Sequence, residues 1–129
     1  MREVRVAEAL ELLDRAVAAK GGDYIYEWIW TPETGSACLN FHEGQPSCLI
    51  GHVLSYLGVT PDMVVGRNGH GVWVVSRFLC DQGIVRFSPL AEAALSKAQE
   101  AQDNGDPWGR AVTLAKTFVT ARAGNINDF

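Results

Sequence analysis

The sequence contains no long hydrophobic run. No apolar stretch in its 129 residues approaches the ~20 residues that a membrane-spanning helix needs. The N-terminal residues, MREVRVAEALELLDRA, mix acidic and basic side chains in an amphipathic pattern, whereas a signal peptide carries a continuous apolar segment. We therefore expect a cytoplasmic protein that has no membrane partner.

Positive charge is also scarce. Eleven Lys and Arg residues are set against fifteen Asp and Glu residues, which gives a net charge of -4, and the two signs are interspersed along the chain. A protein that grips nucleic acid through its phosphates normally carries a basic patch or a basic excess. From its composition we therefore do not expect the protein to bind nucleic acid.

Cysteine is rare and odd in number, with three residues at positions 38, 48 and 80. Their spacing matches no disulfide framework, and free thiols are typical of a reducing compartment. A chain of 129 residues, 47% of them hydrophobic, buries about two thirds of its unfolded surface when it folds. Such a core needs neither a metal nor a disulfide, so we expect no cofactor.

No repeat, low-complexity tract or linker divides the chain, which predicts one domain over residues 1–129. We predict an α+β fold that is mostly helical, with one aromatic β-hairpin and a C-terminal antiparallel pair of helices. The sequence leaves homo-oligomerisation open.

The aromatic hairpin is predicted directly after a first amphipathic helix, which occupies the first twenty residues and ends at Gly21-Gly22. Residues 23–30, DYIYEWIW, alternate in the manner of a strand, and TPETG at 31–35 supplies a turn. Residues 37–41 can then return antiparallel. One face of this hairpin is expected to carry Tyr24, Tyr26, Trp28 and Trp30.

Capping residues place the central elements. Ser47 is predicted to cap a helix that ends at Gly58, and Thr60-Pro61 to open a short helical turn. A further helix is expected over 72–79, followed by an extended segment over 84–87.

The C-terminal pair of helices is predicted from two cap-and-proline signals. Ser88-Pro89 begins a helix to about Asp103, and Asp106-Pro107 begins a last helix that ends at Gly124. Alanines on the first of these helices permit close approach, and Trp108 is expected to fold back over it near Ala98 and Ala101.

Three blocks of the chain resemble a group of small, uncharacterised proteins of actinobacteriophages and actinobacterial prophages. The blocks are GDYIYE at 22–27, GQPSCLIGHVLSYLGV at 44–59 and AQEAQDNGDPWGRAV at 98–112. The resemblance implies a phage-encoded accessory protein that acts inside the host cell, and it brings no activity, cofactor or catalytic residue with it. Some small actinobacteriophage proteins bind and disturb a host protein.

Four residues, Cys38, His42, Cys48 and His52, have the side-chain types of a zinc site, although their spacing departs from the usual ligand pairs. A second interpretation makes Cys48 a nucleophile at a helix N-terminus, with His42 or His52 as its base. Core packing is the favoured account of the cysteines. We therefore lean away from an enzyme.

Residues 50–68 also resemble a helix-turn-helix around Gly58, in which Thr60, Arg67 and Asn68 would contact DNA. The competing interpretation is that these short helices merely pack a core, and the acidic composition opposes DNA binding.

The leading functional prediction is a non-enzymatic accessory protein that binds a host protein and modulates host physiology. Tyr and Trp are the usual anchors of protein interfaces, and four large rings exceed the room that alanine-rich helices leave in a core. The binding residues are therefore predicted as Tyr24, Tyr26, Glu27, Trp28 and Trp30, with Glu33 nearby. The alternative is a helix-turn-helix DNA-binding regulator. A cluster of acids at the C-terminal helices, Glu100, Asp103 and Asp106, is assigned to capping and solvation.

Overall fold

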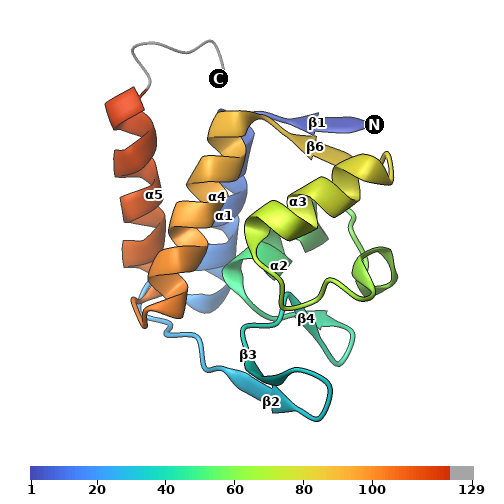
Figure 1. Ribbon diagram of the computed structural model, residues 1–129. Coiled ribbons are helices and arrows are strands. Elements are labelled where there is room, and N and C mark those ends of the chain that lie inside the picture. The colour runs from blue at the N-terminus through green and yellow to red at the C-terminus, as the bar shows by residue number, and fades with distance from the viewer. Residues whose placement is uncertain (123–129) are drawn as a thin grey trace.

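The computed structural model describes residues 1–122, in which the longest elements are three helices of 15 residues each. These are α1 (Val6–Lys20), α4 (Pro89–Asp103) and α5 (Trp108–Arg122), and all three contact one another (Figure 1). Only residues 104–107 connect α4 to α5, so these two helices form the predicted antiparallel pair. The predicted end of α5 at Gly124 lies outside the described residues.

Shorter helices pack beside this bundle. They are α2 (Leu49–Tyr56), the 3₁₀ helix η1 (Pro61–Val64) and α3 (Val72–Asp81). α2 contacts both α1 and α4, whereas α3 lies against α4 and η1 (Figure 1). The helix predicted over 72–79 is therefore confirmed.

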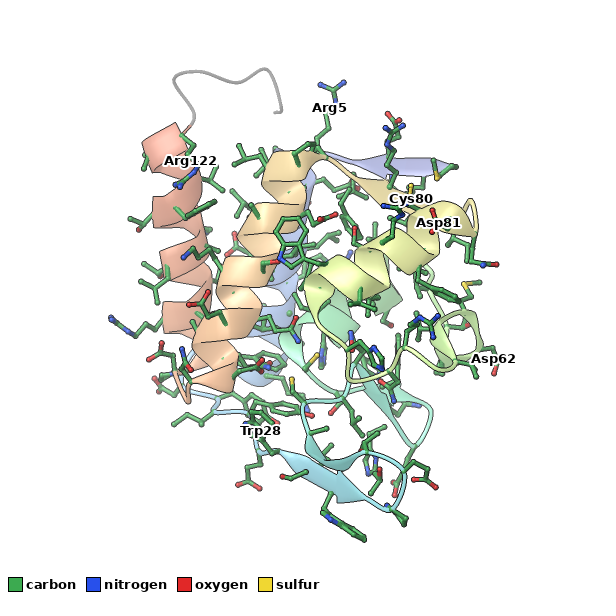
Figure 2. All side chains as sticks on the ribbon, in the orientation of Figure 1. Arg5, Trp28, Asp62, Cys80, Asp81 and Arg122 are labelled. Carbon is green, nitrogen blue, oxygen red and sulfur yellow. The ribbon has the colours of Figure 1, made fainter. Side chains whose placement is uncertain are left out.

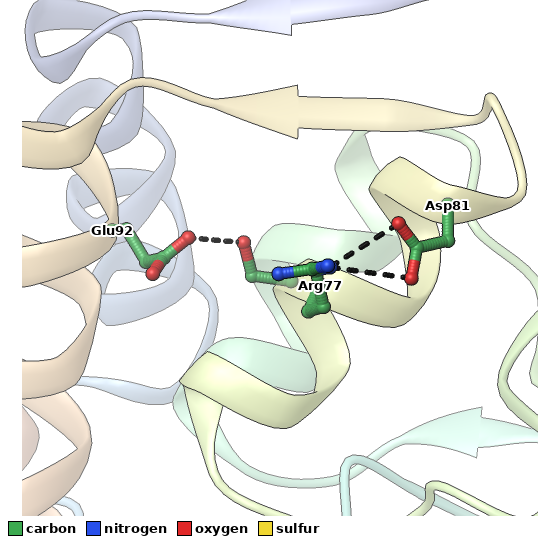
Figure 3. A network of polar contacts seen from close by, with 4 residues as sticks. Arg77, Asp81 and Glu92 are labelled. Atoms are coloured by element: carbon green, nitrogen blue, oxygen red, sulfur yellow. Dashed lines mark hydrogen bonds and ion pairs between the residues drawn. The ribbon is translucent and has the colours of Figure 1, made fainter.

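A polar contact joins α3 to α4. Ser76 of α3 donates a hydrogen bond from its Oγ to the carboxylate of Glu92, and the next residue, Arg77, pairs with Asp81 one turn further along α3 (Figure 3). Ser76 is buried and Arg77 is exposed, so the serine contact is the one that holds the two helices together.

Three two-stranded sheets complete the α+β fold. β1 (Arg2–Val4) pairs in parallel with β6 (Val85–Phe87), and Arg2 lies opposite Val85. The amphipathic helix predicted within the first twenty residues is confirmed as α1, which begins at Val6, whereas the strand that precedes it was not predicted. Pairing between strands more than 80 residues apart leaves no trace in local periodicity.

Two antiparallel hairpins replace the single predicted one. The first joins β2 (Ile29–Thr31) to β3 (Gly35–Ala37), and the second joins β4 (Phe41–His42) to β5 (Gln45–Pro46). The predicted strands 23–30 and 37–41 are thus too long, and residues 41–46 form the second hairpin. Its central residues Glu43 and Gly44 have φ values of 52° and 78°, as a tight hairpin turn requires.

Two of the four predicted helix starts are confirmed, at Ser88-Pro89 and Thr60-Pro61, whereas α5 begins at Trp108 and not at the predicted Pro107. Ser88 Oγ accepts from the N–H of Ala91, and Thr60 precedes Pro61 at the start of η1. At α2, however, the capping residue is Cys48, whose Sγ accepts from the N–H of Gly51. Ser47 is unable to cap because its hydroxyl bonds to another side chain, as described below.

Trp108 joins the N-terminus of α5 to the rest of the core. Its ring is fully buried and packs edge-on against Tyr24 and His52, with ring centroids 4.8 and 5.2 Å away. The backbone N–H of Trp108 donates to the carbonyl of Tyr24, and that of Gly109 donates to Gly22. The loop after α1 thereby satisfies two N–H groups that begin α5.

We expect Gly51→Ala to destabilise the protein by about 1 to 3 kcal/mol or more, because a Cβ at Gly51 would lie 1.8 Å from the carbonyl oxygen of Asn40. Urea denaturation measures the change. Gly71→Ala is the matched control, since a Cβ there meets no atom within 4 Å and the expected change is below about 1 kcal/mol. Equal midpoints for the two variants would contradict the close approach.

Truncation of Trp108 is expected to cost about 3 to 5 kcal/mol in Trp108→Ala, and Ala98→Leu about 1 to 3 kcal/mol by overpacking the buried face of α4. Trp108→Phe should cost less than the alanine variant, because the indole Nε1 makes no hydrogen bond within residues 1–122 and none is lost. Denaturation midpoints check the order, and a Trp108→Ala midpoint equal to that of the parent would show that the ring is not part of the core.

Candidate functional site

A cleft of about 560 Å³ lies between the first hairpin, the start of α3 and the second half of α4. We call it the tryptophan cleft, because Trp28 and Trp73 both line it. Their side chains are 51% and 59% exposed, which is unusual for the largest apolar side chain. The residues of α4 that line it are Ser96, Gln99, Glu100 and Asp103.

The segment before the first hairpin decides which of its rings face solvent. Tyr26 is buried, and its hydroxyl bonds to Ser47 Oγ at 2.9 Å and accepts from the N–H of Leu39 at 3.1 Å. Burial raises the pKa of Tyr26 to about 12, so the hydroxyl stays neutral and its hydrogen bonds persist. With Tyr26 held inside, Trp28 turns outward.

The predicted aromatic face is therefore divided. Tyr24 packs on Trp108 and Tyr26 enters the core, whereas Trp28, Trp30 and the neighbouring Glu27 are exposed. Strict alternation would keep all four rings on one face, but residues 23–28 are irregular, and the two sets separate. Tyr26 is therefore a core residue and Tyr24 is half-buried against the core, whereas the two tryptophans and Glu27 face solvent.

Trp73 was not among the residues predicted for the site. It lies among neighbouring apolar residues of the helix predicted over 72–79, which hide its exposure in the sequence. Val72, Val75 and Leu79 share the buried stripe of α3, and Trp73 falls outside that stripe. A helical wheel of α3 would have identified it as an exposed ring.

Polar groups without partners line the α4 side of the cleft. Gln99 is only 7% exposed, and its side-chain amide forms no hydrogen bond with residues 1–122. Ser96 Oγ is buried and equally unpartnered among those residues. Ser96 Oγ lies below the surface, whereas the amide of Gln99 is not among the buried unpartnered atoms and so keeps some contact with the cleft. The Gln99 amide is therefore the group to which a ligand in the cleft can supply a hydrogen bond.

The charge of the cleft is negative. Glu100 and Asp103 are the charged residues that line it within the described part of the chain. Lys97 approaches Glu100 to 4.0 Å, and Gln102 donates to Asp103 at 3.1 Å. The sequence predicted only capping and solvation for these acids. In the structure, Glu100 and Asp103 also lie beside the two tryptophans.

Arginines gather elsewhere in the molecule. Arg5, Arg86 and Arg122 line a second hollow of about 580 Å³. Figure 2 shows Arg5 and Arg122 at the end of the molecule opposite Trp28. The negative charge of the cleft is therefore not neutralised by these side chains.

Two of the three cysteines, Cys38 and Cys48, meet in the core beside the side chain of Gln102, whereas Cys80 is partly exposed on α3. The Nε2 of Gln102 donates to Cys38 Sγ at 3.0 Å, and its Oε1 accepts from the N–H of Leu49 at 2.8 Å. The hydrogen bond with Cys48 and burial raise the pKa of the Cys38 thiol. Burial opposes ionisation of Cys48 too, but hydrogen bonds from Cys38 and the backbone of α2 outweigh it and lower the Cys48 pKa.

The positions of Cys48, His42 and His52 do not match those that a reactive nucleophile or a zinc site would need. Cys48 is fully buried, so a substrate does not reach it. His42 lies in β4 beside Glu43, and His52 directs Nδ1 to the backbone oxygen of Cys48 at 3.0 Å. Within residues 1–122, no three histidine, cysteine or acidic side chains are grouped to hold a metal ion.

Two of the residues predicted to contact DNA, Asn68 and Arg67, make contacts within the fold instead. The amide of Asn68 bonds to both the N–H and the carbonyl of Phe41, at 2.9 and 2.8 Å. The guanidinium of Arg67 lies 4.9 Å from the ring centroid of Phe78. Thr60 begins a 3₁₀ helix of four residues where a recognition α-helix would have to lie. The predicted helix-turn-helix is therefore corrected to α2, a single 3₁₀ turn and a loop.

The chain matches no family model, no curated protein and no solved structure. Among the helices of residues 1–122, none combines the length and the apolar character that crossing a bilayer requires. The site must accordingly be interpreted from its own residues.

His52 makes stability depend on pH. Burial lowers the pKa of His52 below its ordinary value of 6.5, so this side chain binds a proton less readily in the folded protein than in the unfolded chain. Above pH 6.5 both states are neutral and stability is complete, whereas below it the free energy of unfolding should fall with pH. His52→Gln removes this titration, so urea midpoints between pH 5 and 7 should vary less in the variant than in the parent. Identical slopes would contradict the assignment.

Proposed function

We propose that this protein is a non-enzymatic accessory protein of phage origin that binds a host protein and thereby modulates host physiology. The single observation that carries the proposal is the exposure of three tryptophans, Trp28, Trp30 and Trp73, at 51%, 69% and 59%. Each exposed indole leaves a large apolar area in contact with water, and its burial in a complex is favourable.

The surroundings of these rings fit an interface. Glu27 and Glu33 are exposed on the first hairpin, near Trp28 and Trp30 in the chain. Apolar anchors within a polar rim are the arrangement from which interface hot spots are built. We name this surface, Trp28, Trp30 and Trp73 with Glu27 and Glu33, the tryptophan surface.

The sequence resemblance supplies the setting. The blocks at 22–27, 44–59 and 98–112 resemble actinobacteriophage and prophage proteins, which points to the cytoplasm of an actinobacterial host as the place of action. The first block holds Tyr24 and Tyr26 and the third holds Trp108, so two of the three blocks include rings that support the hairpin from inside.

A pull-down from actinobacterial lysate tests the proposal, with the purified chain as bait. A host protein should be captured by the parent and by Val65→Ala, which changes an exposed apolar residue outside the tryptophan surface. Capture should fall about 30-fold or more in Trp28→Ala or Trp30→Ala, as for a hot-spot residue. Thermal melting of each variant confirms that the fold is retained.

Two results would overturn host binding. One is the recovery of no partner that depends on Trp28 or Trp30. The other is self-association that depends on these residues, seen as a dimer by light scattering of the parent and lost in Trp28→Ala, because the surface would then join copies of this chain.

A further inference from the structure

The walls of the tryptophan cleft are suited to a flat cation. Trp28 and Trp73 come from separate elements, the segment before β2 and the first turn of α3, and both indoles face the same cleft. Indole is the strongest of the aromatic side chains in cation–π contacts, and a guanidinium plane also stacks on it. The aromatic walls therefore favour a planar cation over an alkyl group.

The floor and rim of the cleft offer hydrogen-bond acceptors. The amide oxygen of Gln99 is unpartnered within residues 1–122, and the carboxylates of Glu100 and Asp103 add negative charge at the edge. An arginine side chain presents five N–H donors in a fixed plane and no acceptor, which complements this set. A lysine ammonium presents three donors around a point and leaves the flat walls unused.

We propose that the tryptophan cleft binds an arginine side chain of the protein partner, stacked against Trp28 and Trp73 and hydrogen-bonded to Gln99. The inference deepens the proposed function and rests on it for the origin of the arginine. The volume of about 560 Å³ lies within the range of ligand pockets, so flanking peptide backbone also has room. Lys97, at 4.0 Å from Glu100, is the internal cation that the guanidinium would meet at the rim.

Binding is measured on the full chain by ¹H–¹⁵N correlation spectra, with the peptide acetyl-Gly-Arg-Gly-amide as the probe. The chain has four tryptophans, and their indole N–H signals are assigned with single Trp→Phe variants. The signals of Trp28 and Trp73 should move on addition of the peptide, while that of the buried Trp108 stays in place. Absence of movement at Trp28 and Trp73 overturns the inference.

The same peptide with citrulline in place of arginine is the matched ligand control, because citrulline keeps the planar shape without the charge. It should bind at least about 5-fold more weakly, within the range of a cation–π contact. Equal binding of the citrulline peptide, or of a lysine peptide, overturns the assignment to arginine.

Variants of the cleft separate its parts. Trp73→Ala should lower the affinity for the arginine peptide about 2- to 30-fold. Gln99→Leu should lower this affinity as well and leave the fold intact, since no hydrogen bond of the described chain is lost. Trp30→Ala is the control, because Trp30 is exposed but does not line the cleft. Unchanged affinity in both Trp73→Ala and Gln99→Leu would place the peptide elsewhere and overturn the inference.

The two proposals fail separately. If lysate capture depends on Trp28 but the arginine peptide neither binds nor competes, the host-binding function stands and the arginine site is wrong. If the arginine peptide binds in the cleft but no host protein depends on Trp28 or Trp30, the site stands and the proposed function is wrong.

Discussion

The side chain of Gln102 holds together the parts of the molecule on which everything else depends. From the last turn of α4 it reaches the first N–H of α2 at Leu49 and the thiol of Cys38, with the same amide nitrogen also donating to Asp103. Gln102 is almost completely buried, so these bonds form where water does not compete with them. One amide thus fixes the end of the first hairpin, the start of α2 and the end of α4 relative to one another.

The tryptophan cleft is a consequence of this arrangement. Cys38 directly follows β3, and Asp103 directly follows Gln102, so the amide sets the distance between the two sides of the cleft. The polar groups of α4 and the indole of Trp28 therefore line one cleft, whose two sides this amide joins.

The helical half of the fold was open to prediction because its signals are local. Cap-and-proline pairs at Ser88-Pro89 and Thr60-Pro61 lie next to the turns that they begin, and alanine spacing identified the pair of α4 and α5. The hairpin region was harder, since the burial of Tyr26 is decided by partners at Leu39 and Ser47. Sequence alternation had no means of showing that this contact would pull the tyrosine inward and leave Trp28 outside.

The candidate site was half visible in the same way. Trp28, Trp30 and Glu27 were predicted as exposed binding residues and lie at the surface. Trp73 was obscured by the apolar residues around it, and Gln99 and Ser96 carry no signature at all, because an unpartnered polar group is defined by what surrounds it in three dimensions. Sites assembled from several elements are recovered from single sequences only in part.

The parallel pairing of β1 with β6 bears on the order in which the chain is made. During synthesis from the N-terminus, Arg2–Val4 emerges first, but Val85–Phe87 follows more than 80 residues later. β1 therefore has no strand to pair with while most of the helices are translated. Its pairing with β6 is a late, long-range event of the kind that slows folding. A bulky fusion at the N-terminus would lie directly beside the paired strands β1 and β6, whereas an insertion between α4 and α5 would lie far from them (Figure 1).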